Sequence, residues 1–305
     1  MNANSPFRIE GPAVISFSGG RTSAYLLRRV LDEGIRPDVH VLFENTGKER
    51  EETLRFVHEV GVRWGVPIRW LEYRRKWLPR YRSAERARAA AAARDAVGVA
   101  GVERPQGERE PGWAEVDFAT ASRSGEPFDN LIQLMGLPNQ TTRLCTSELK
   151  IRVAKKWMMA QGYDHWTNVV GIRADEPKRV ARMRNPDAQD EHYDNDLPLA
   201  KAGVTKADVV EFWRAQPFDL GLPVDENLET YGGNCDLCML KSTAKRLRLI
   251  RDDPKSVDWW INNERRTDMT FLHGGKDYTQ LRDEALKSNA CGTDADDLGD
   301  CICHD

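Results

Sequence analysis

The chain alternates short apolar runs with stretches in which apolar residues recur every three or four positions. The runs Ala13 to Phe17, Val39 to Phe43 and Ile68 to Leu71 are typical of buried strands. Between them the helical spacing predicts helices that end near Gly34 and Trp64. Strands that alternate with helices of this length imply a parallel sheet with helices on both faces. The sequence therefore predicts an α/β fold whose ligands bind at the carboxyl ends of the strands.

This alternation breaks between residues 78 and 127. An Arg/Ala-rich stretch there is followed by Gly, Pro and Glu without apolar periodicity, which indicates an insertion that is part helix and part loop. The apolar pattern resumes at 128–137 and then predicts a helix at 147–161 and a strand at 166–171. We assign residues 1–77 and 128–225 to one α/β domain. Residues 226–305 form a cysteine-containing extension with two charged helices and a polar tail.

Composition narrows the class of protein. With 305 residues, of which 40% are hydrophobic, the chain can bury a sizeable core. A formal net charge of −3 gives no global reason to expect nucleic acid or an anionic membrane as a partner. No apolar run approaches the ~20 residues needed to span a bilayer, and the first twelve residues are polar. We expect a soluble, cytoplasmic protein whose six cysteines are reduced and serve metal, cluster or redox chemistry.

A candidate phosphate loop follows the first strand. The run is Ser18-Gly19-Gly20-Arg21-Thr22-Ser23, and it opens the first helix. Such a loop offers an anion unpaired backbone N–H groups, hydroxyl donors and the positive end of a helix dipole. Glycine permits the close approach of phosphate, and the lysine and longer spacing of a Walker loop are missing. A glycine turn that only links strand and helix is the alternative.

Three further motifs follow in order. They are Glu44-Asn45-Thr46-Gly47-Lys48-Glu49 with Glu52-Thr53; Gly171-Ile172-Arg173-Ala174-Asp175-Glu176 with Arg179; and Leu197-Pro198-Leu199 with Thr205-Lys206-Ala207-Asp208-Val209 and the Pro217 to Pro223 turn. Together with the loop, this series resembles the phosphoadenosine phosphosulfate reductase family of PP-loop proteins. The resemblance covers most of the chain outside the insertion and the tail. It implies a PP-loop (HUP-like) sheet.

The resemblance also implies a site for an adenine nucleotide, either ATP with Mg²⁺ or an adenylyl sulfate. The loop would hold the phosphates, with Ser16 before it and Gly171 beside it. The turn Asn45-Thr46-Gly47 would lie near the adenosine.

Two arginines of the third motif are candidate catalytic residues. The resemblance implies that Arg173 and Arg179 clamp a phosphate or sulfate, for which a planar, bidentate donor is suited. The alternative for each arginine is a surface ion pair with Asp175 or Glu176.

The cysteines are spaced for a metal or cluster. Cys235 and Cys238 form a Cys-x-x-Cys in a Gly-Gly turn, which lets two thiolates converge. Cys145 precedes a helix whose N-terminus, together with Arg143, favours a thiolate. Iron–sulfur members of the wider PP-loop group carry cysteines at similar places, so the resemblance implies a [4Fe-4S] cluster on these three. Zinc and a redox dithiol are the alternatives.

The fourth ligand and the tail are left open. The ligand is either absent or one of Cys291, Cys301 and Cys303, of which we assign Cys303. The tail Asp300-Cys301-Ile302-Cys303-His304 is also similar to the carboxyl terminus of sulfonucleotide reductases, which makes Cys301 a candidate nucleophile. Asp in place of Glu, Ile302 in place of Gly and the second cysteine depart from that pattern.

Two basic runs could bind tRNA or DNA beside the cluster. They are Arg74, Arg75, Lys76, Arg80, Arg82, Arg86 and Arg88, and Lys241, Lys245, Arg246, Arg248 and Arg251. A solvated helix face is the commoner explanation of such runs.

Three functions follow from these observations. The first is a sulfurtransferase that splits ATP, adenylates an oxygen of a nucleic acid or small molecule, and replaces it with sulfur from a donor. The second is a sulfonucleotide reductase that makes sulfite with Cys301 and a thioredoxin-like reductant. The third is a non-catalytic nucleotide-binding accessory protein. The oligomeric state does not follow from the sequence.

Overall fold

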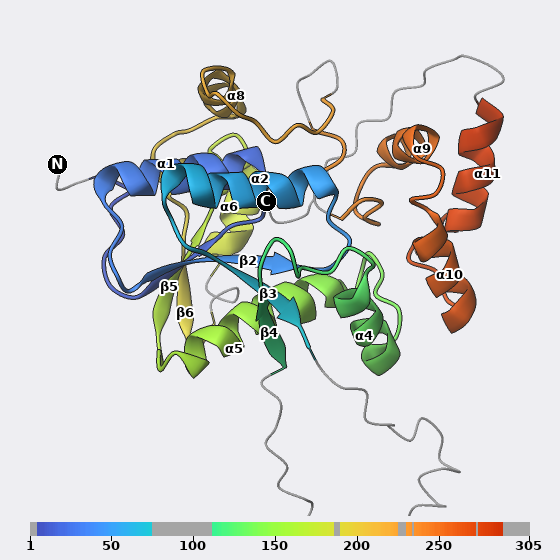
Figure 1. The fold of residues 1–305 in the computed structure, drawn as a ribbon, viewed down its shortest axis with the longest axis horizontal. Helices are drawn as coiled ribbons and strands as arrows, with labels where there is room; N and C mark the ends of the chain where they lie inside the picture. Colours follow the sequence, from blue (N-terminus) through green and yellow to red (C-terminus); the bar gives the residue numbers. More distant parts are fainter. Residues whose placement is uncertain are drawn as a thin grey trace, which may run out of the picture.

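A mostly parallel sheet organises the chain. The computed structural model describes residues 5–74, 112–185, 190–224, 230–233, 235–272 and 274–288. Within them five strands run parallel in the order β3-β2-β1-β5-β6, and β4 pairs antiparallel with β3 (Figure 1). The strands are β1 (Ala13–Ser16), β2 (Val39–Asn45), β3 (Ile68–Tyr73), β4 (Trp113–Val116), β5 (Trp166–Val170) and β6 (Tyr193–Asp196). The predicted α/β fold is confirmed.

The order of the strands reverses beside β1. From β1 the chain moves outward through β2 and β3, and it later returns to place β5 on the other side of β1. In an open parallel sheet such a reversal leaves a crevice at the carboxyl ends of the two strands, where ligands bind. The loops that follow β1 and β5 flank this crevice. The fold thus places the Ser18 and Arg173 motifs next to each other.

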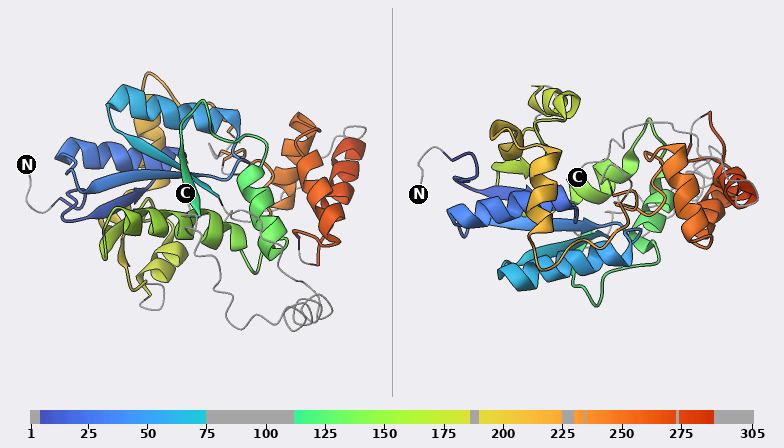
Figure 2. Two further views of the ribbon diagram at one scale, coloured as in Figure 1. Left: turned by 60° about the horizontal axis from the view of Figure 1, so that its bottom comes forward. Right: turned by 90° about the horizontal axis from the view of Figure 1, so that it is seen from above.

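Helices cover both faces of the sheet (Figures 1 and 2). One face carries α1 (Arg21–Glu33), α2 (Glu51–Trp64) and α8 (Lys206–Arg214). The other carries α4 (Glu126–Met135), the π-helix η1 (Cys145–Ile151) and α5 (Arg152–Ala160). Beyond α4 stand α9 (Thr243–Asp252), α10 (Asp258–Thr267) and α11 (Tyr278–Ser288); α6 (Pro177–Arg184) and α7 (Pro198–Lys201) pack near the end of β5.

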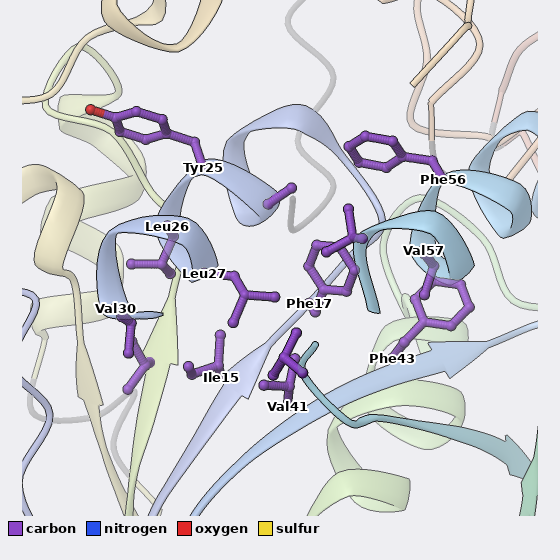
Figure 3. Packing of buried hydrophobic residues seen from close by; sticks show 14 of the residues in the cluster. Ile15, Phe17, Tyr25, Leu26, Leu27, Val30, Val41, Phe43, Phe56 and Val57 are labelled. Carbon is purple, nitrogen blue, oxygen red and sulfur yellow. The ribbon is translucent and has the colours of Figure 1, made fainter. Parts of the chain in front are cut away.

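Successive strand residues serve two separate cores, because side chains alternate between the faces of a sheet. Ile15, Val41 and Phe43 pack beneath α1 and α2 (Figure 3). Val14 and Leu42 belong instead to the cluster on the opposite face. A strand buried on both faces reads as a continuous apolar run, which is why β1 and β2 were predictable.

The C-terminal helices share the second core with the sheet. Trp260 of α10 is fully buried, and its ring centroid lies 6.1 Å from that of Phe128 on α4 and 5.1 Å from that of Tyr278 on α11. The Tyr278 hydroxyl donates a hydrogen bond to the carbonyl of Leu237, between the two cysteines of the Cys-x-x-Cys. Helices α10 and α11 therefore hold the cysteine loop against the sheet.

Some elements were not predicted. Strand β4 lies inside the range assigned to the insertion, whose residues 78–111 fall outside the described part of the chain. Strand β6 was missed because its sequence, Tyr-Asp-Asn-Asp, is polar and it lies at the edge of the sheet. Helix α11 lies where a polar tail was expected. It was missed because it buries little apart from Tyr278, Leu281 and Ala285. The helix expected from Ser147 begins as a π-helix at Cys145.

Gly19 gives a test of the loop's packing. Its φ is +79°, and an added Cβ would lie 2.8 Å from Thr53 Cγ2 and 3.0 Å from Val57 Cγ2. We expect Gly19→Ala to lower the free energy of unfolding by about 2 to 4 kcal/mol, since it combines a left-handed backbone with overpacking. Urea denaturation measures this loss.

Gly65 at the end of α2 provides the matched control. Its φ is +62°, but a Cβ added there would meet no atom of the described residues within 4 Å. Gly65→Ala should lose only about 1 kcal/mol, from the left-handed backbone conformation alone. Equal losses in the two variants would contradict the tight packing of the loop.

Candidate functional site

The loop after β1 forms an uncapped helix start. Gly20 is the N-cap of α1, and no side chain of the described residues caps the helix. The hydroxyls of Ser18 and Ser23 lie 3.0 Å apart, and Ser23 Oγ also donates to the carbonyl of Gly20 at 3.0 Å. The first N–H groups of a helix have no partner within it, and the helix dipole makes them attractive to anions. The loop therefore has the geometry of a phosphate cradle.

Neighbouring residues hold this helix start in place. Arg21 Nε donates to Asp219 Oδ1 at 2.7 Å, and Trp213 Nε1 donates to the Arg21 carbonyl at 2.9 Å. The Arg21 side chain is thus bound to Asp219, and its contribution to the cradle is its backbone. Thr22 Oγ1 accepts a hydrogen bond from Arg173 Nη1 at 3.2 Å, which joins the two loops of the crevice.

Gly171 allows the same two loops to approach closely. A Cβ on Gly171 would lie 3.3 Å from Ser23 Cα and 3.5 Å from Ser23 N. The first of these contacts is tighter than most side chains make, and the second is an ordinary contact, so a larger residue would require a small shift of β5 or α1. Gly171 therefore acts by packing against the cradle.

The two predicted clamp arginines are both paired in part. Arg173 Nε donates to Asp175 Oδ1 at 2.9 Å, and Arg179 Nη1 pairs with the Glu176 carboxylate. The ion pairs weighed as the alternative are therefore present. However, Nε and Nη2 of Arg179 are buried and have no hydrogen-bond partner among the described residues. Because unpaired buried donors are costly, this edge of the guanidinium is suited to an incoming anion.

Arg182 lies near two other arginines. Burial lowers the pKa of Arg182, and the charges of Arg143 and Arg179 lower it further. Arg143 itself has a φ of +44°, which a non-glycine residue adopts only when its surroundings enforce it. The positive charges around Arg182 favour an anion near it. Arg182 was not among the residues that the sequence pointed to.

The Asn45 turn is held by its own side chains. Asn45 is fully buried, and its Nδ2 donates to Glu72 Oε1 at 2.7 Å and to the Ser122 carbonyl at 2.8 Å. Its Oδ1 accepts the N–H of Gly47 at 3.1 Å. Asn45 therefore stabilises the turn, while a contact of the turn with adenosine stays a prediction. Ser122 and Glu72 were missed because they lie far away in the sequence.

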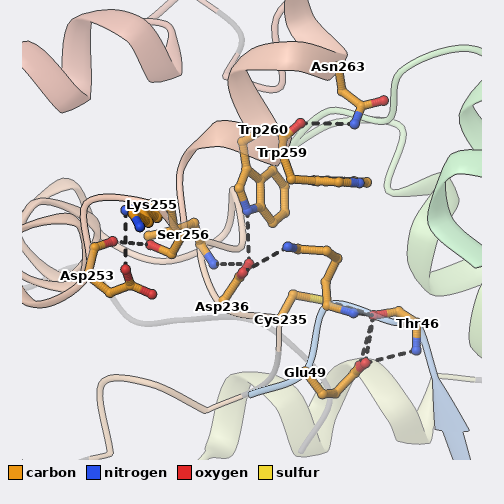
Figure 4. A network of polar contacts seen from close by, with 12 residues as sticks. Thr46, Glu49, Cys235, Asp236, Asp253, Lys255, Ser256, Trp259, Trp260 and Asn263 are labelled. Atoms are coloured by element: carbon orange, nitrogen blue, oxygen red, sulfur yellow. Dashed lines mark hydrogen bonds and ion pairs between the residues drawn. The ribbon is translucent and has the colours of Figure 1, made fainter. Parts of the chain in front are cut away.

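The same turn contacts the cysteine loop (Figure 4). The Glu49 carboxylate accepts from Thr46 N and Thr46 Oγ1, both at 2.9 Å, and Thr46 Oγ1 lies 3.4 Å from Cys235 Sγ. Asp236 accepts from Trp260 Nε1 at 2.9 Å. These bonds tie the end of β2 to the loop that carries Cys235.

Two buried lysines complete the junction. Lys48 Nζ lies 3.0 Å from Asp236 Oδ2, and the Asp236 N–H donates to the Lys48 carbonyl at 2.8 Å. Lys241 Nζ donates to the carbonyls of Gly233 and Cys235. The Cys-x-x-Cys loop is therefore fixed from both sides.

Three of the predicted cysteine ligands lie near one another. Burial raises the pKa of Cys145 to about 11 and the pKa of Cys235 well above its ordinary value, and Cys238 raises both. The charge of Lys150 opposes both shifts. The thiols of Cys145 and Cys235 thus both lie near Cys238, in a protein interior that favours their neutral form.

The described part of the chain contains no group of three or more His, Cys, Asp or Glu side chains that could hold a metal ion. The predicted roles of Cys291, Cys301 and Cys303 fall on residues outside the described ranges.

A cavity of about 160 Å³ lies between the sheet and the η1 and α5 segment. Ser16 Oγ donates to Asn168 Oδ1 at 2.9 Å, and Asn168 Nδ2 donates to Asn195 Oδ1 at 2.8 Å, so hydrogen bonds cross its floor from β1 to β6. Its lining residues are Val14, Ser16, Ser18, Glu44, Thr146, Lys150, Ile151, Ala154, Lys155, Trp166, Asn168, Val170, Met183, Tyr193 and Asn195. Since Ser18 belongs to the phosphate loop, the cavity adjoins the cradle.

Glu44 is the titratable group with the most unusual setting in this cavity. Its Oε1 is buried without a hydrogen-bond partner among the described residues. Burial raises the pKa of Glu44 to about 7, although the charge of Lys150 partly opposes this. The burial of Glu44 in a cavity was not predicted. Two features of the sequence could have indicated the cavity, namely a carboxylate at the end of the apolar run 39–43 and Asn168 inside an apolar strand.

Comparison with known proteins gives one relationship. The chain matches no protein-family model. It is 34% identical over 235 residues to the uncharacterized nin region protein ORF290 of Escherichia phage lambda, which covers 76% of this chain and 67% of the phage protein. The chain belongs to the nin region ORF290 family.

In this member of the nin region ORF290 family, part of the second basic run is structural. Lys241 and Arg246 are buried, and Arg246 Nη1 donates to the carbonyl of Met239 at 2.9 Å. These two side chains are therefore not placed to meet nucleic acid. The first run lies outside the described residues except for Arg74, which pairs with Glu72 at 2.8 Å.

Within the residues that the structure describes, no helix combines the length and apolar character needed to cross a bilayer.

Glu44 makes the stability of this family member depend on pH. Its carboxyl has a reference pKa of 4.5 when unfolded and about 7 when folded, so the folded chain binds the proton more tightly. This contribution is complete below about pH 4.5 and is lost as the pH rises through about 7. Relative to Glu44→Gln, the wild type should lose on the order of 2 to 3 kcal/mol between about pH 4.5 and pH 8.

Urea denaturation across this pH range measures the difference. Glu10→Gln is the control, because the Glu10 side chain is 77% exposed and its removal should leave the pH profile unchanged. Parallel profiles for the wild type and Glu44→Gln would show that Glu44 does not hold its proton in the folded chain.

Proposed function

We propose that this chain is an enzyme that binds an adenine nucleotide on the loop from Ser18 to Ser23 and uses it in sulfur chemistry. The observation that carries the proposal is an uncapped helix start at the reversal of strand order. Arg173 joins it to the loop that precedes Arg179, whose Nε and Nη2 have no partner among the described residues. Backbone N–H groups and a guanidinium edge bind phosphate oxygens by charge-assisted hydrogen bonds. The choice of adenine as the base and of sulfur as the transferred element comes from the resemblance to the phosphoadenosine phosphosulfate reductase family.

The proposed reaction begins with ATP and Mg²⁺. An oxygen of the acceptor attacks the α-phosphorus, the bond from that phosphorus to the bridging oxygen breaks, and magnesium pyrophosphate leaves. Hydrosulfide, released by the donor, then attacks the activated carbon and loses its proton to solvent, the C–O bond breaks, and AMP leaves. The loop N–H groups, Arg173 and Arg179 would hold the phosphates in line and stabilise the charge that develops on them.

We assign a [4Fe-4S] cluster to Cys145, Cys235 and Cys238, with Cys303 or no residue as the fourth ligand. The donor set fits, because the buried Cys235 and Cys238 and the partly buried Cys145 share one apolar cluster, and Lys150 adds a positive charge near them. Four irons hold thiolates farther apart than one tetrahedral ion does. When bound, such a cluster supplies a site for sulfur or electrons.

The acceptor is a nucleic acid, such as tRNA or DNA, or a small molecule. The described surface favours neither, since Lys241 and Arg246 are buried. We place the enzyme in the cytoplasm, where thiols stay reduced.

Arg179 provides a direct test of the phosphate site. We expect Arg179→Ala to weaken ATP binding about tenfold to hundredfold, because it removes charge-assisted hydrogen bonds worth about 1.5 to 3 kcal/mol. Isothermal titration calorimetry measures the affinity. Arg214→Ala is the control, because it removes the same charge from an exposed position on α8. Equal affinities for both variants would contradict the assignment of Arg179.

The reaction itself is tested on protein prepared without oxygen. We expect about four irons per chain and release of pyrophosphate from ATP when the acceptor nucleic acid or small molecule is added. Cys145→Ser and Cys238→Ser should lose the iron and keep ATP binding. A colourless protein with one zinc would contradict the cluster. Formation of sulfite from an adenylyl sulfate would replace the transfer reaction with sulfonucleotide reduction.

A further inference from the structure

The cavity that contains Glu44, which we call the Glu44 cavity, has features that phosphate binding does not explain. Its floor is the sheet, and Ile151, Ala154 and Met183 contribute apolar atoms on the helical side. Trp166 adds an aromatic ring at the far end. A narrow space between apolar walls with a few polar groups is typical of sites for small ring compounds.

Most polar side chains that line the Glu44 cavity are already paired. Ser16, Asn168 and Asn195 bond to one another in a row, and Lys155 Nζ bonds to Asp190 at 2.8 Å and 3.1 Å. Glu44 Oε1 differs, because it is buried and has no partner among the described residues. At about pH 8, where the affinities are to be compared, Glu44 is above its pKa of about 7 and ionised, and a carboxylate oxygen accepts hydrogen bonds and cannot donate them. The group that Glu44 lacks is therefore an N–H or O–H donor.

The position of Ser18 suggests where that donor comes from. Ser18 lines the Glu44 cavity and also belongs to the phosphate loop. One molecule with phosphates at one end and a ring at the other can therefore reach both places. In a nucleotide, the part that lies beyond the phosphates is the sugar and its base.

We propose that the Glu44 cavity holds the base of the bound nucleotide and that Glu44 accepts a hydrogen bond from the exocyclic amino group of adenine. The inference rests on the proposed function, since it concerns the same nucleotide site. It makes Glu44 a specificity-determining residue. Filling the cavity with this base gives the buried Oε1 its missing donor and covers the apolar wall.

The contribution of the amino group can be measured without changing the rest of the ligand. Purine riboside triphosphate has the ring, sugar and phosphates of ATP but carries hydrogen in place of the amino group. A hydrogen bond to a charged group gives about tenfold to hundredfold in affinity. The wild type should prefer ATP over purine riboside triphosphate by this factor.

Two substitutions separate the hydrogen bond from the shape of the cavity. Glu44→Leu has no acceptor and should bind both nucleotides with equal affinity. Glu44→Gln keeps an acceptor oxygen of similar position, so it should keep a reduced preference for ATP. Titration calorimetry on the full-length protein, in EDTA to prevent turnover, gives all six affinities.

The outcomes distinguish this inference from the proposed function. Binding of both nucleotides with the same ratio in the wild type and in Glu44→Leu overturns the role of Glu44 and leaves the phosphate site in place. Absence of a preference in the wild type does the same. If the wild type binds neither nucleotide, the proposed function fails and the inference fails with it.

Discussion

The backbone N–H groups at the start of α1 have no side chain among the described residues to pair with, and the surrounding residues preserve this arrangement. A serine or aspartate at the N-cap would satisfy one of these groups and weaken the cradle. Here the N-cap is Gly20, and the Ser18 and Ser23 hydroxyls lie beside it. The uncapped start gives up helix stability and gains a place for an anion. Gly19 and Gly171 contribute by letting α2 and β5 pack tightly against the loop.

A second arrangement connects this loop region to the cysteines. The turn after β2 carries Thr46, Lys48 and Glu49, and all three contact the Cys235 loop through hydrogen bonds, an ion pair or backbone pairing. The charge of Lys150 acts on Glu44 and on both Cys145 and Cys235. The loops at the ends of the strands and the thiols therefore belong to one packed unit. Chemistry that needs both would require no large movement between them.

The sequence was most informative where local chemistry determines structure. The strand, glycine loop and helix from residue 13 to 34 could be predicted because apolar period and glycine punctuation coincide there. The nearness of Cys145 to the Cys-x-x-Cys also followed, through the resemblance. Strand β6 and helix α11 could not be predicted, because an edge strand and a sparsely buried helix leave little apolar pattern.

Residue roles that depend on contacts between distant parts of the chain could not be predicted from a single sequence. Asn45 was expected near adenosine, but its side chain is occupied by Glu72 and Ser122, which are 27 and 77 residues away. Glu44 belongs to a quoted motif, yet its unpaired oxygen is visible only once β1, β5 and α5 surround it. Arg179 forms the ion pair that was the alternative, while its Nε and Nη2 have no partner among the described residues, so its role as a clamp stays a prediction. Burial and pairing, which decide these roles, are properties of the folded chain.

The central claim is that the start of α1 holds the phosphates of an adenine nucleotide. A crystal structure of the protein with α,β-methylene-ATP and Mg²⁺ tests it most directly, since this analogue cannot be split between its α and β phosphates. We expect phosphate oxygens within hydrogen-bond distance of the backbone N–H groups of Gly20 to Ser23 and of Arg179. A nucleotide bound elsewhere, with this loop empty, would contradict the account.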